Sequence, residues 1–261
     1  MANTIQTDRP KKVLIVISEA HSFPIKKSDG STKDQPSGYF LMELAKPLEK
    51  LLDAGYDVEF ASPTGAEPKP DPLSESTILA FLGNYWQKKH EHDLVEGKMK
   101  EEKNFKTPTP FADIKDENLR DYAGVFIPGG HAPLSDLGDN KELGRILQHF
   151  HDRHKPTAAI CHGPYAFLST QVSGEFAYKG YKITSWSDAE EKLMETLLWG
   201  EIKKVESSLR EAGAEMVEGV GTALGSITVD REVVSGANPM AADALGDKFV
   251  QMLKGDGAPK A

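Results

Sequence analysis

The order of apolar segments near the start of the chain constrains the fold more than any other feature. Residues 12–18 read KVLIVIS, a continuous apolar run that is typical of a strand buried on both faces of a parallel sheet. Residues 38–54 repeat apolar side chains every three or four positions, which predicts a helix that stops at Gly55. Residues 56–61 predict a second strand. This order favours a right-handed crossover between parallel strands.

The same alternation continues along the chain and predicts one α/β sandwich with a mostly parallel sheet over residues 12–255. The further expected strands are 124–127, 157–160, 181–186 and a hairpin of 226–229 with 233–235, and the further expected helices are 141–153, 189–199, 202–212 and 239–253. The remaining segments are expected to be a disordered arm (1–11), a polar loop (19–37) and a charged helical insertion (about 74–106).

Composition excludes several classes of protein. The chain has 261 residues, a single cysteine and a formal net charge of −9. One cysteine rules out an intrachain disulfide and a cysteine-rich zinc site, and it suits a reducing compartment, so we expect a cytoplasmic protein. The acidic balance argues against nucleic acid and membranes as partners. No run of 18 apolar residues is present, so no transmembrane helix is expected.

Cys161 lies in a turn that is typical of catalytic nucleophiles. Residues 159–163 read AICHG, the small–any–nucleophile–any–Gly spacing that hydrolases use, with serine, for a sharp and strained strand-to-helix turn. The next helix would point its N-terminus at the sulfur and favour the thiolate, and the N–H groups of the turn are placed to hold an oxyanion. A buried structural cysteine is the alternative.

Other residues also follow directly on predicted strands. Gly129 and Gly130 come after residues 124–127, and Glu19 comes after the first strand. Because ligands gather at the carboxyl ends of parallel strands, a site is expected at this edge of the sheet. The turn at Gly129 and Gly130, expected beside the turn of Cys161, favours a reactive Cys161 over a structural one. A metal site at His90-Glu91-His92 is not expected, since side chains two positions apart on a helix diverge.

Several motifs together resemble the ThiJ/PfpI superfamily. Residues 128–131 (PGGH) and 159–164 (AICHGP) are similar to its two signature turns. Residues 38–47, 59–63 and 235–239 resemble its heat-shock-protein-31-like branch, which contains glutathione-independent glyoxalases (glyoxalase III) and holding chaperones. The resemblance covers nearly the whole chain in the same order. It implies a flavodoxin-like three-layer sandwich that is usually a homodimer.

The resemblance also implies the site residues. Cys161 would be the nucleophile, His162 its neighbouring imidazole, and Glu43 a helix-borne acid that hydrogen-bonds the sulfur and relays protons; without the resemblance, Glu43 would be taken for a solvated helix residue. Contacts to the substrate are expected from the two turns and a nearby tryptophan, namely Gly129, Gly130, His131, Gly163 and Trp186. No metal and no other cofactor is expected.

The acid that orients His162 falls after residue 186. An ungapped match to the family selects Glu191, and a gap of one residue would select Glu190 instead. A purely structural role is the rival for Glu191, because a helix that begins near Asp188 could use Asp188 as N-cap and Glu191 to complete a capping box.

These residues imply an enzyme that acts on a small reactive aldehyde. The expected reaction is the conversion of methylglyoxal to lactate without glutathione, a lyase activity of the glyoxalase III type (D-lactate dehydratase class) in aldehyde detoxification under stress. Since the reaction is an internal redox change, it needs no nicotinamide, and no G-x-G-x-x-G motif follows a predicted strand. The alternatives within the superfamily are a holding chaperone and a cysteine-dependent amidase or peptidase.

Overall fold

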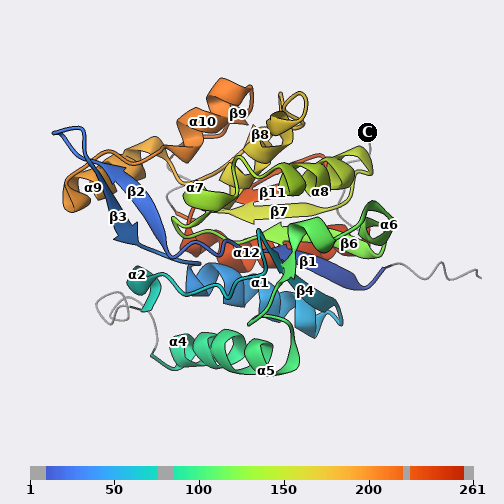
Figure 1. Ribbon diagram of the computed structural model, residues 1–261. Helices are drawn as coiled ribbons and strands as arrows, with labels where there is room; N and C mark the ends of the chain where they lie inside the picture. Colours follow the sequence, from blue (N-terminus) through green and yellow to red (C-terminus); the bar gives the residue numbers. More distant parts are fainter. Residues whose placement is uncertain (1–9, 76–84, 220–223, 256–261) are drawn as a thin grey trace, which may run out of the picture.

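The computed structural model describes residues 10–75, 85–219 and 224–255. A central sheet crosses the molecule (Figure 1) in the order β10 (Ile227–Asp230), β11 (Val233–Gly236), β7 (Thr157–Ile160), β6 (Tyr122–Ile127), β1 (Lys12–Val16), β4 (Asp57–Ser62) and β5 (Thr109–Pro110). Neighbouring strands are parallel except for the hairpin of β10 and β11. The mostly parallel sheet and the hairpin confirm the predicted fold class.

Strand β1 shows why the sheet is buried on both faces. Its side chains alternate between two apolar cores, with Val13 and Ile15 in one and Leu14 and Val16 in the other. All four are fully buried. A strand with two covered faces must be apolar throughout, which is the pattern that the sequence shows.

Helices cover both faces of the sheet and complete three layers (Figure 1). Helices α1 (Leu41–Asp53) and α12 (Ala242–Lys254) pack side by side on one core, through apolar side chains such as Leu44. Helix α8 (Lys141–Asp152) and the 3₁₀ helix η3 (Gly163–Val172) pack on the other core.

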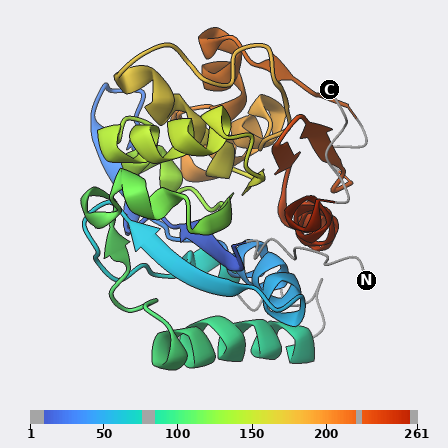
Figure 2. The ribbon, with the colours of Figure 1, turned by 90° about the vertical axis from the view of Figure 1, so that its right-hand side faces the viewer.

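Shorter elements surround these layers. The insertion contributes α2 (Pro72–Glu75), α4 (Tyr85–His92), the π-helix η1 (Asp93–Met99) and α5 (Lys100–Glu102). Figure 2 shows that α4, η1 and α5 lie beyond α1, on its side away from the sheet. The other short elements are η2 (Phe111–Asp113), α6 (Asp116–Leu119), α7 (Pro133–Asp136), β8 (Lys182–Ile183), α9 (Asp188–Leu198), α10 (Val205–Ala212), β9 (Glu215–Met216) and η4 (Pro239–Ala241).

The predicted polar loop at residues 19–37 is wrong in its middle. Strands β2 (Ser22–Lys26) and β3 (Thr32–Pro36) form an antiparallel hairpin there. Only Phe23 and Ile25 of β2 turn inward and are buried, while β3 is almost entirely solvent-exposed. Two buried positions are too few to give a recognisable alternation in the sequence.

Two further expectations need correction. The strand predicted over residues 181–186 is reduced to β8, which pairs with β9 outside the central sheet. The helix predicted from residue 202 begins at Val205. The expected disordered arm lies almost wholly outside the described residues, as do residues 76–84 near the start of the expected insertion. In the described ranges, no helix combines the length and apolarity needed to cross a membrane.

Candidate active site

The cysteine turn is strained in the way that its spacing predicts. Cys161 follows β7 directly and has φ of 61°, a left-handed conformation that costs a non-glycine residue free energy. Its backbone is held on both sides, because its N–H donates to the carbonyl of Gly236 and its carbonyl accepts from the N–H of Trp186. A Cβ at Gly163 would lie 2.4 Å from the carbonyl oxygen of Ile127, so this position requires glycine.

The second turn brings two glycines against the cysteine. A Cβ at Gly129 would lie 2.4 Å from Oε2 of Glu43 and 2.7 Å from Cβ of Cys161. Gly130 has φ of 95°, and a Cβ there would lie 2.1 Å from the carbonyl oxygen of Gly38. Both residues are therefore glycine because backbone and acid approach closely at this point.

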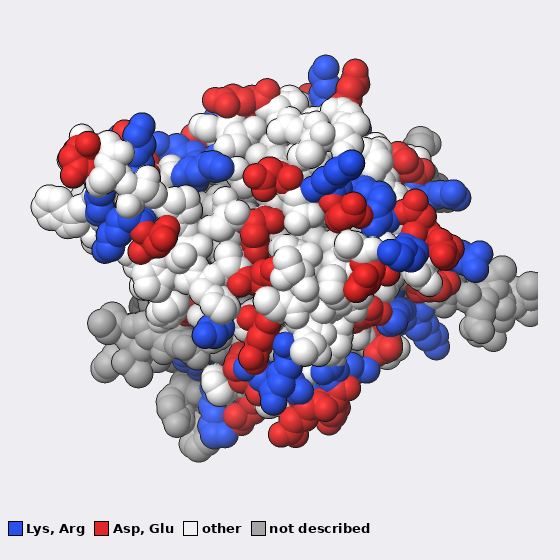
Figure 3. All heavy atoms as spheres, in the orientation of Figure 1, with Lys and Arg blue, Asp and Glu red and all other residues white. Residues whose placement is uncertain are grey.

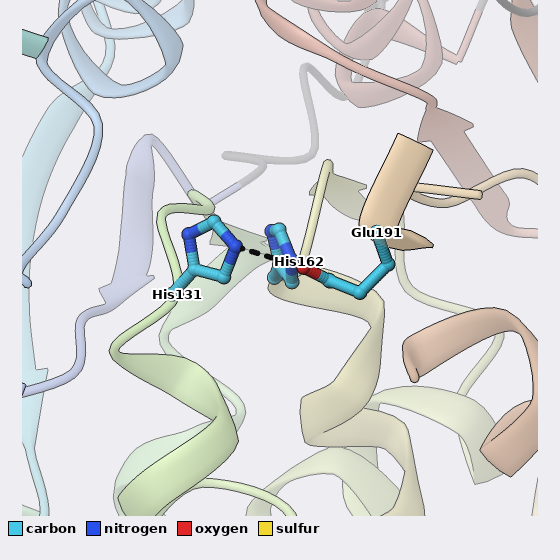
Figure 4. Close-up of side chains that lie close together, drawn as sticks. All are labelled: His131, His162 and Glu191. Carbon is cyan, nitrogen blue, oxygen red and sulfur yellow. Dashed lines mark hydrogen bonds and ion pairs between the residues drawn. The ribbon is translucent and has the colours of Figure 1, made fainter. Parts of the chain in front are cut away.

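A triad of Cys161, His162 and Glu191 links the cysteine turn to α9. Nδ1 of His162 lies 3.2 Å from Sγ of Cys161, and Nε2 of His162 lies 2.8 Å from Oε2 of Glu191. Figure 4 shows Glu191 reaching from α9 to the imidazole. Because the carboxylate can only accept, we assign the proton of neutral His162 to Nε2. Nδ1 is then free to accept the proton of the thiol.

The structure places Glu191, and not Glu190, against His162. The predicted cap of α9 is wrong by one residue: the N-cap is Ser187, and Glu190 completes the capping box with it. Asp188 instead accepts hydrogen bonds from Ser207 at the start of α10. The capping box therefore occupies Glu190 and leaves the side chain of Glu191 for the triad.

Four rings follow one another across the site. Phe23 stacks on His131 with centroids 4.6 Å apart, His131 lies 4.1 Å from His162, and His162 lies 5.5 Å from Trp186. The indole N–H of Trp186 is buried and has no hydrogen-bond partner among the described residues. It is a donor that a bound oxygen can satisfy.

Charges in the triad follow from burial and hydrogen bonding. Burial alone would raise the pKa of Glu191, but hydrogen bonds from His131 and His162 lower it to about 2. Burial and the neighbouring His131 lower the pKa of His162 to about 4. At neutral pH the resting triad therefore holds one negative charge, on Glu191, beside a neutral imidazole.

Glu43 is completely buried beneath the cysteine, near the start of α1. Burial raises its pKa to about 8, although the thiol of Cys161 and the amides of Gly129 and Gly130 act in the opposite direction. Neither carboxyl oxygen makes a well-formed hydrogen bond within the described residues. Glu43 is therefore protonated at neutral pH and is a proton donor next to the sulfur.

The thiol of Cys161 is less readily ionised than its turn predicts. Cys161 is only 4% exposed, and the element after it is a 3₁₀ helix. Burial and the charge that Glu43 carries when ionised raise the pKa of the thiol, while the amides of Gly130 and His162 lower it. The turn therefore does not by itself produce a thiolate, and a base must take the proton.

One group of described residues has the composition of a metal site. Ligand atoms of His131, His162 and Glu191 lie within 4.8 Å of one another, and all three residues are buried. Both imidazoles already bond the carboxylate, one on each oxygen. The group is thus satisfied as a hydrogen-bonded network.

The structure brings together the expected catalytic and substrate-contact residues, which are Glu43, Gly129, Gly130, His131, Cys161, His162, Gly163, Trp186 and Glu191. Glu19, which also follows a strand at this edge of the sheet, instead accepts hydrogen bonds from Ser62, Thr64 and Ala66. Sequence reasoning missed Phe23. Its segment has no site motif, and nothing in a single sequence reports the contact of residue 23 with residue 131.

The chain is similar to known proteins over nearly its whole length. The protein/nucleic acid deglycase HchA of Escherichia coli O1:K1 / APEC is 28% identical over 255 residues, covering 93% of this chain and 81% of HchA. The crystal structure of glyoxalase III from Candida albicans is 26% identical with a TM-score of 0.71, covering 94% of this chain and 97% of that one. The Rapid Encystment Protein 24 kDa of Francisella tularensis is 22% identical with a TM-score of 0.75, covering 93% of this chain and 99% of that one, and shares the fold.

The family predicted from the two turns and the other motifs together is confirmed by a match that spans most of the chain. Residues 37–252 match the family model described as the DJ-1/PfpI family. The protein belongs to the DJ-1/PfpI family.

Proposed function

We propose that this protein converts methylglyoxal to lactate without glutathione, with Cys161 as the nucleophile. The observation that carries the proposal is the pairing of two neutral groups at the sulfur. His162 offers an unprotonated Nδ1 at 3.2 Å, and Glu43 is a protonated acid whose pKa is raised to about 8. One can take a proton while the other gives one, as addition of a thiol to an aldehyde requires.

The first step forms a hemithioacetal. Sγ of Cys161 bonds to the aldehyde carbon, the thiol proton passes to Nδ1 of His162, and the aldehyde oxygen takes the proton of Glu43. Glu191 stabilises the imidazolium that results. The amides of Gly130 and His162, which already favour negative charge on the sulfur, are placed to polarise the oxygen.

The next steps move one hydrogen from C1, the former aldehyde carbon, to C2, the ketone carbon of methylglyoxal. Ionised Glu43 takes the proton from C1 while His162 protonates the oxygen on C2, which gives an enediol. Glu43 then returns its proton to C2, and His162 takes the proton from the oxygen on C1, which leaves a lactoyl thioester. Water hydrolyses the thioester: its hydroxyl joins C1, its other proton goes to Glu43, and His162 protonates the departing sulfur. No external electron acceptor is required.

The decisive experiment is lactate formation by the pure protein from methylglyoxal alone, beside Cys161→Ser. We expect the serine variant to lose at least about a hundredfold in rate, because a hydroxyl is far less ionised than a thiol at neutral pH. Equal melting temperatures would exclude unfolding as the cause. A wild-type protein that forms no lactate, or a serine variant of normal rate, would refute the proposal.

The size of the substrate separates this reaction from the deglycation of macromolecules and from peptide cleavage. The similar HchA proteins are named protein/nucleic acid deglycases. A cysteine that is 4% exposed favours a free aldehyde over a carbonyl adduct on a macromolecule, and the same burial disfavours a peptidase. Release of methylglyoxal from preformed protein adducts, faster than free methylglyoxal is consumed, would support deglycation instead. Cleavage of a fluorogenic peptide would support a peptidase.

A holding chaperone is the second candidate, and α9 is the observation that favours it. Leu193 and Leu197 are each 63% exposed on this helix, and Trp199 after it is 83% exposed. Exposed apolar side chains of this size can bind unfolded chains. Suppression of aggregation that persists in Cys161→Ser and is lost in Leu193→Ser with Leu197→Ser would establish this function.

Other expectations stay predictions. We expect a homodimer, which sedimentation would detect, and a cytoplasmic location with a small aldehyde as the main partner. On the face that Figure 3 shows, the described basic and acidic side chains are intermixed. Such a face is unlike the broad basic surfaces that bind nucleic acid.

A further inference from the structure

We propose that His131 is a positioning residue of the triad, and that the hairpin of β2 and β3 holds it in place. This inference rests on the proposed function only for its kinetic test. It concerns how Glu191 is held, which determines which nitrogen of His162 faces the sulfur.

Each carboxylate oxygen of Glu191 hydrogen-bonds to a different imidazole. Nε2 of His131 lies 3.2 Å from Oε1, and Nε2 of His162 lies 2.8 Å from Oε2. A carboxylate with one oxygen bonded can rotate about its last torsion angle, whereas one held at both oxygens is fixed. His131 therefore keeps Oε2 in line with Nε2 of His162. That bond in turn keeps Nδ1 of His162 unprotonated and directed at Cys161.

The ring of His131 is itself fixed by its neighbours. Phe23 of β2 stacks on it with an angle of 16° between the planes, and His162 lies on it at 42°. Only 7% of His131 is exposed. Figure 4 shows that His131 approaches from the turn on the side opposite α9, so the two imidazoles reach Glu191 from separate elements.

The hairpin connects these elements. Oγ of Ser135, in the helix after His131, donates to the carbonyl of Ser22 at 2.8 Å. Nζ of Lys27 donates to the last carbonyls of the α9 segment, at 3.0 Å to Leu198 and 2.9 Å to Trp199. The hairpin thus touches both the turn that carries His131 and the helix that carries Glu191. The hairpin contributes no group at the sulfur, yet it sets the distance between the turn that carries His131 and the helix that carries Glu191.

The test compares His131→Phe with His131→Gln. Phenylalanine keeps a ring for stacking but has no N–H, whereas the amide nitrogen of glutamine can take the place of Nε2. The matched control is His151→Phe, which breaks another histidine–glutamate pair, with Nδ1 of His151 3.0 Å from Oε1 of Glu232, away from the cysteine.

Two readouts do not depend on the substrate. The ¹⁵N shifts of His162 report its tautomer, and the rate of alkylation by iodoacetamide reports removal of the proton from Cys161, the only cysteine of the chain. In His131→Phe we expect a mixture of tautomers and alkylation slower by about tenfold. His131→Gln should recover most of the wild-type tautomer and alkylation rate, and His151→Phe should behave as wild type. A purely structural role of His131 would lower the melting temperature without changing the tautomer.

The turnover of the variants should rank as their alkylation rates do. With methylglyoxal, kcat of His131→Phe should fall by about tenfold to a hundredfold while KM changes little, and His131→Gln should recover most of the loss. A wild-type tautomer and alkylation rate in His131→Phe, or a glutamine variant as defective as the phenylalanine variant, would overturn the proposal.

A second variant covers the case in which His131→Phe does not fold. Phe23→Leu removes the stacked ring and no hydrogen-bonding atom, so it should slow alkylation of Cys161 in the same direction. An unchanged alkylation rate in that variant would overturn the role of the hairpin. If the wild-type protein forms no lactate while tautomer and alkylation respond as expected, the proposed reaction fails and the positioning role stands.

Discussion

Replacing Glu43 by glutamine should make the protein more stable at neutral pH while it stops the reaction. Glu43 is completely buried, and its pKa is raised from 4.5 to about 8, mainly by burial. Between these values the unfolded chain ionises the carboxyl and the folded chain does not, so the folded state binds more protons there. Stability must therefore fall as the pH rises through this window.

The size of the effect follows from the two pKa values. Ionisation in the unfolded state favours unfolding by about 3 kcal/mol at pH 7 and by about 4 kcal/mol at pH 8, given the rise from 4.5 to about 8, and by only about 1 kcal/mol at pH 5. Glutamine has nearly the shape of the protonated acid and cannot ionise. The difference in unfolding free energy between Glu43→Gln and wild type should therefore grow by about 3 kcal/mol from pH 5 to pH 8.

Urea unfolding followed by circular dichroism at several pH values measures this difference. Other titrating groups cancel because they are present in both proteins, and the same comparison in a Cys161→Ser background removes the coupling to the thiol. Glu117→Gln is the control for the chemical change itself, since Glu117 is exposed on α6. A difference for Glu43→Gln that stays constant from pH 5 to pH 8 would show that Glu43 is ionised in the folded protein, and the reasoning would be wrong.

Three further predictions concern the triad. Glu191→Gln should cut turnover much more than Glu190→Gln, with similar melting temperatures, because glutamine still completes a capping box; steady-state rates of the two variants decide this. His162→Ala should slow alkylation of Cys161 by iodoacetamide at pH 7, since Nδ1 at 3.2 Å is the acceptor of the thiol proton; an unchanged rate would point to another base. The pKa of His162 is near 4 and that of Glu43 is near 8, so kcat/KM should be flat between about pH 5 and 7. It should fall below pH 4 as His162 is protonated and above pH 8 as Glu43 ionises. A pH profile of kcat/KM would reveal both decreases.

The sequence was sufficient where the structure depends on local pattern. The apolar run of β1 predicts a strand with two covered faces, and the spacing around Cys161 predicts the strained turn that its φ of 61° shows. The period of α1 likewise predicts its buried stripe, although the fully buried carboxyl of Glu43 within that stripe could be assigned a role only from family resemblance.

The sequence was insufficient where long-range contacts decide the structure. Phe23 and Ile25 are buried because they join a core cluster built from distant segments, and Phe23 also stacks on His131. No pattern within residues 22–36 contains that information. The choice between Glu190 and Glu191 depended on which serine or aspartate caps α9. Ser187 and Asp188 are both good N-caps by residue type, and only the contact of Asp188 with Ser207 in the next helix distinguishes them.

The charges of the resting site favour a small neutral substrate. Glu191 carries the one negative charge of the triad, and His162 separates it from the sulfur, while Glu43 holds its proton at neutral pH. An anionic substrate would meet a buried carboxylate, and a cationic one would have to be desolvated beside the neutral groups at Cys161. An uncharged aldehyde meets neither cost. Charge appears only once the carbon–sulfur bond forms, and the imidazolium then lies against the carboxylate that His131 and His162 share.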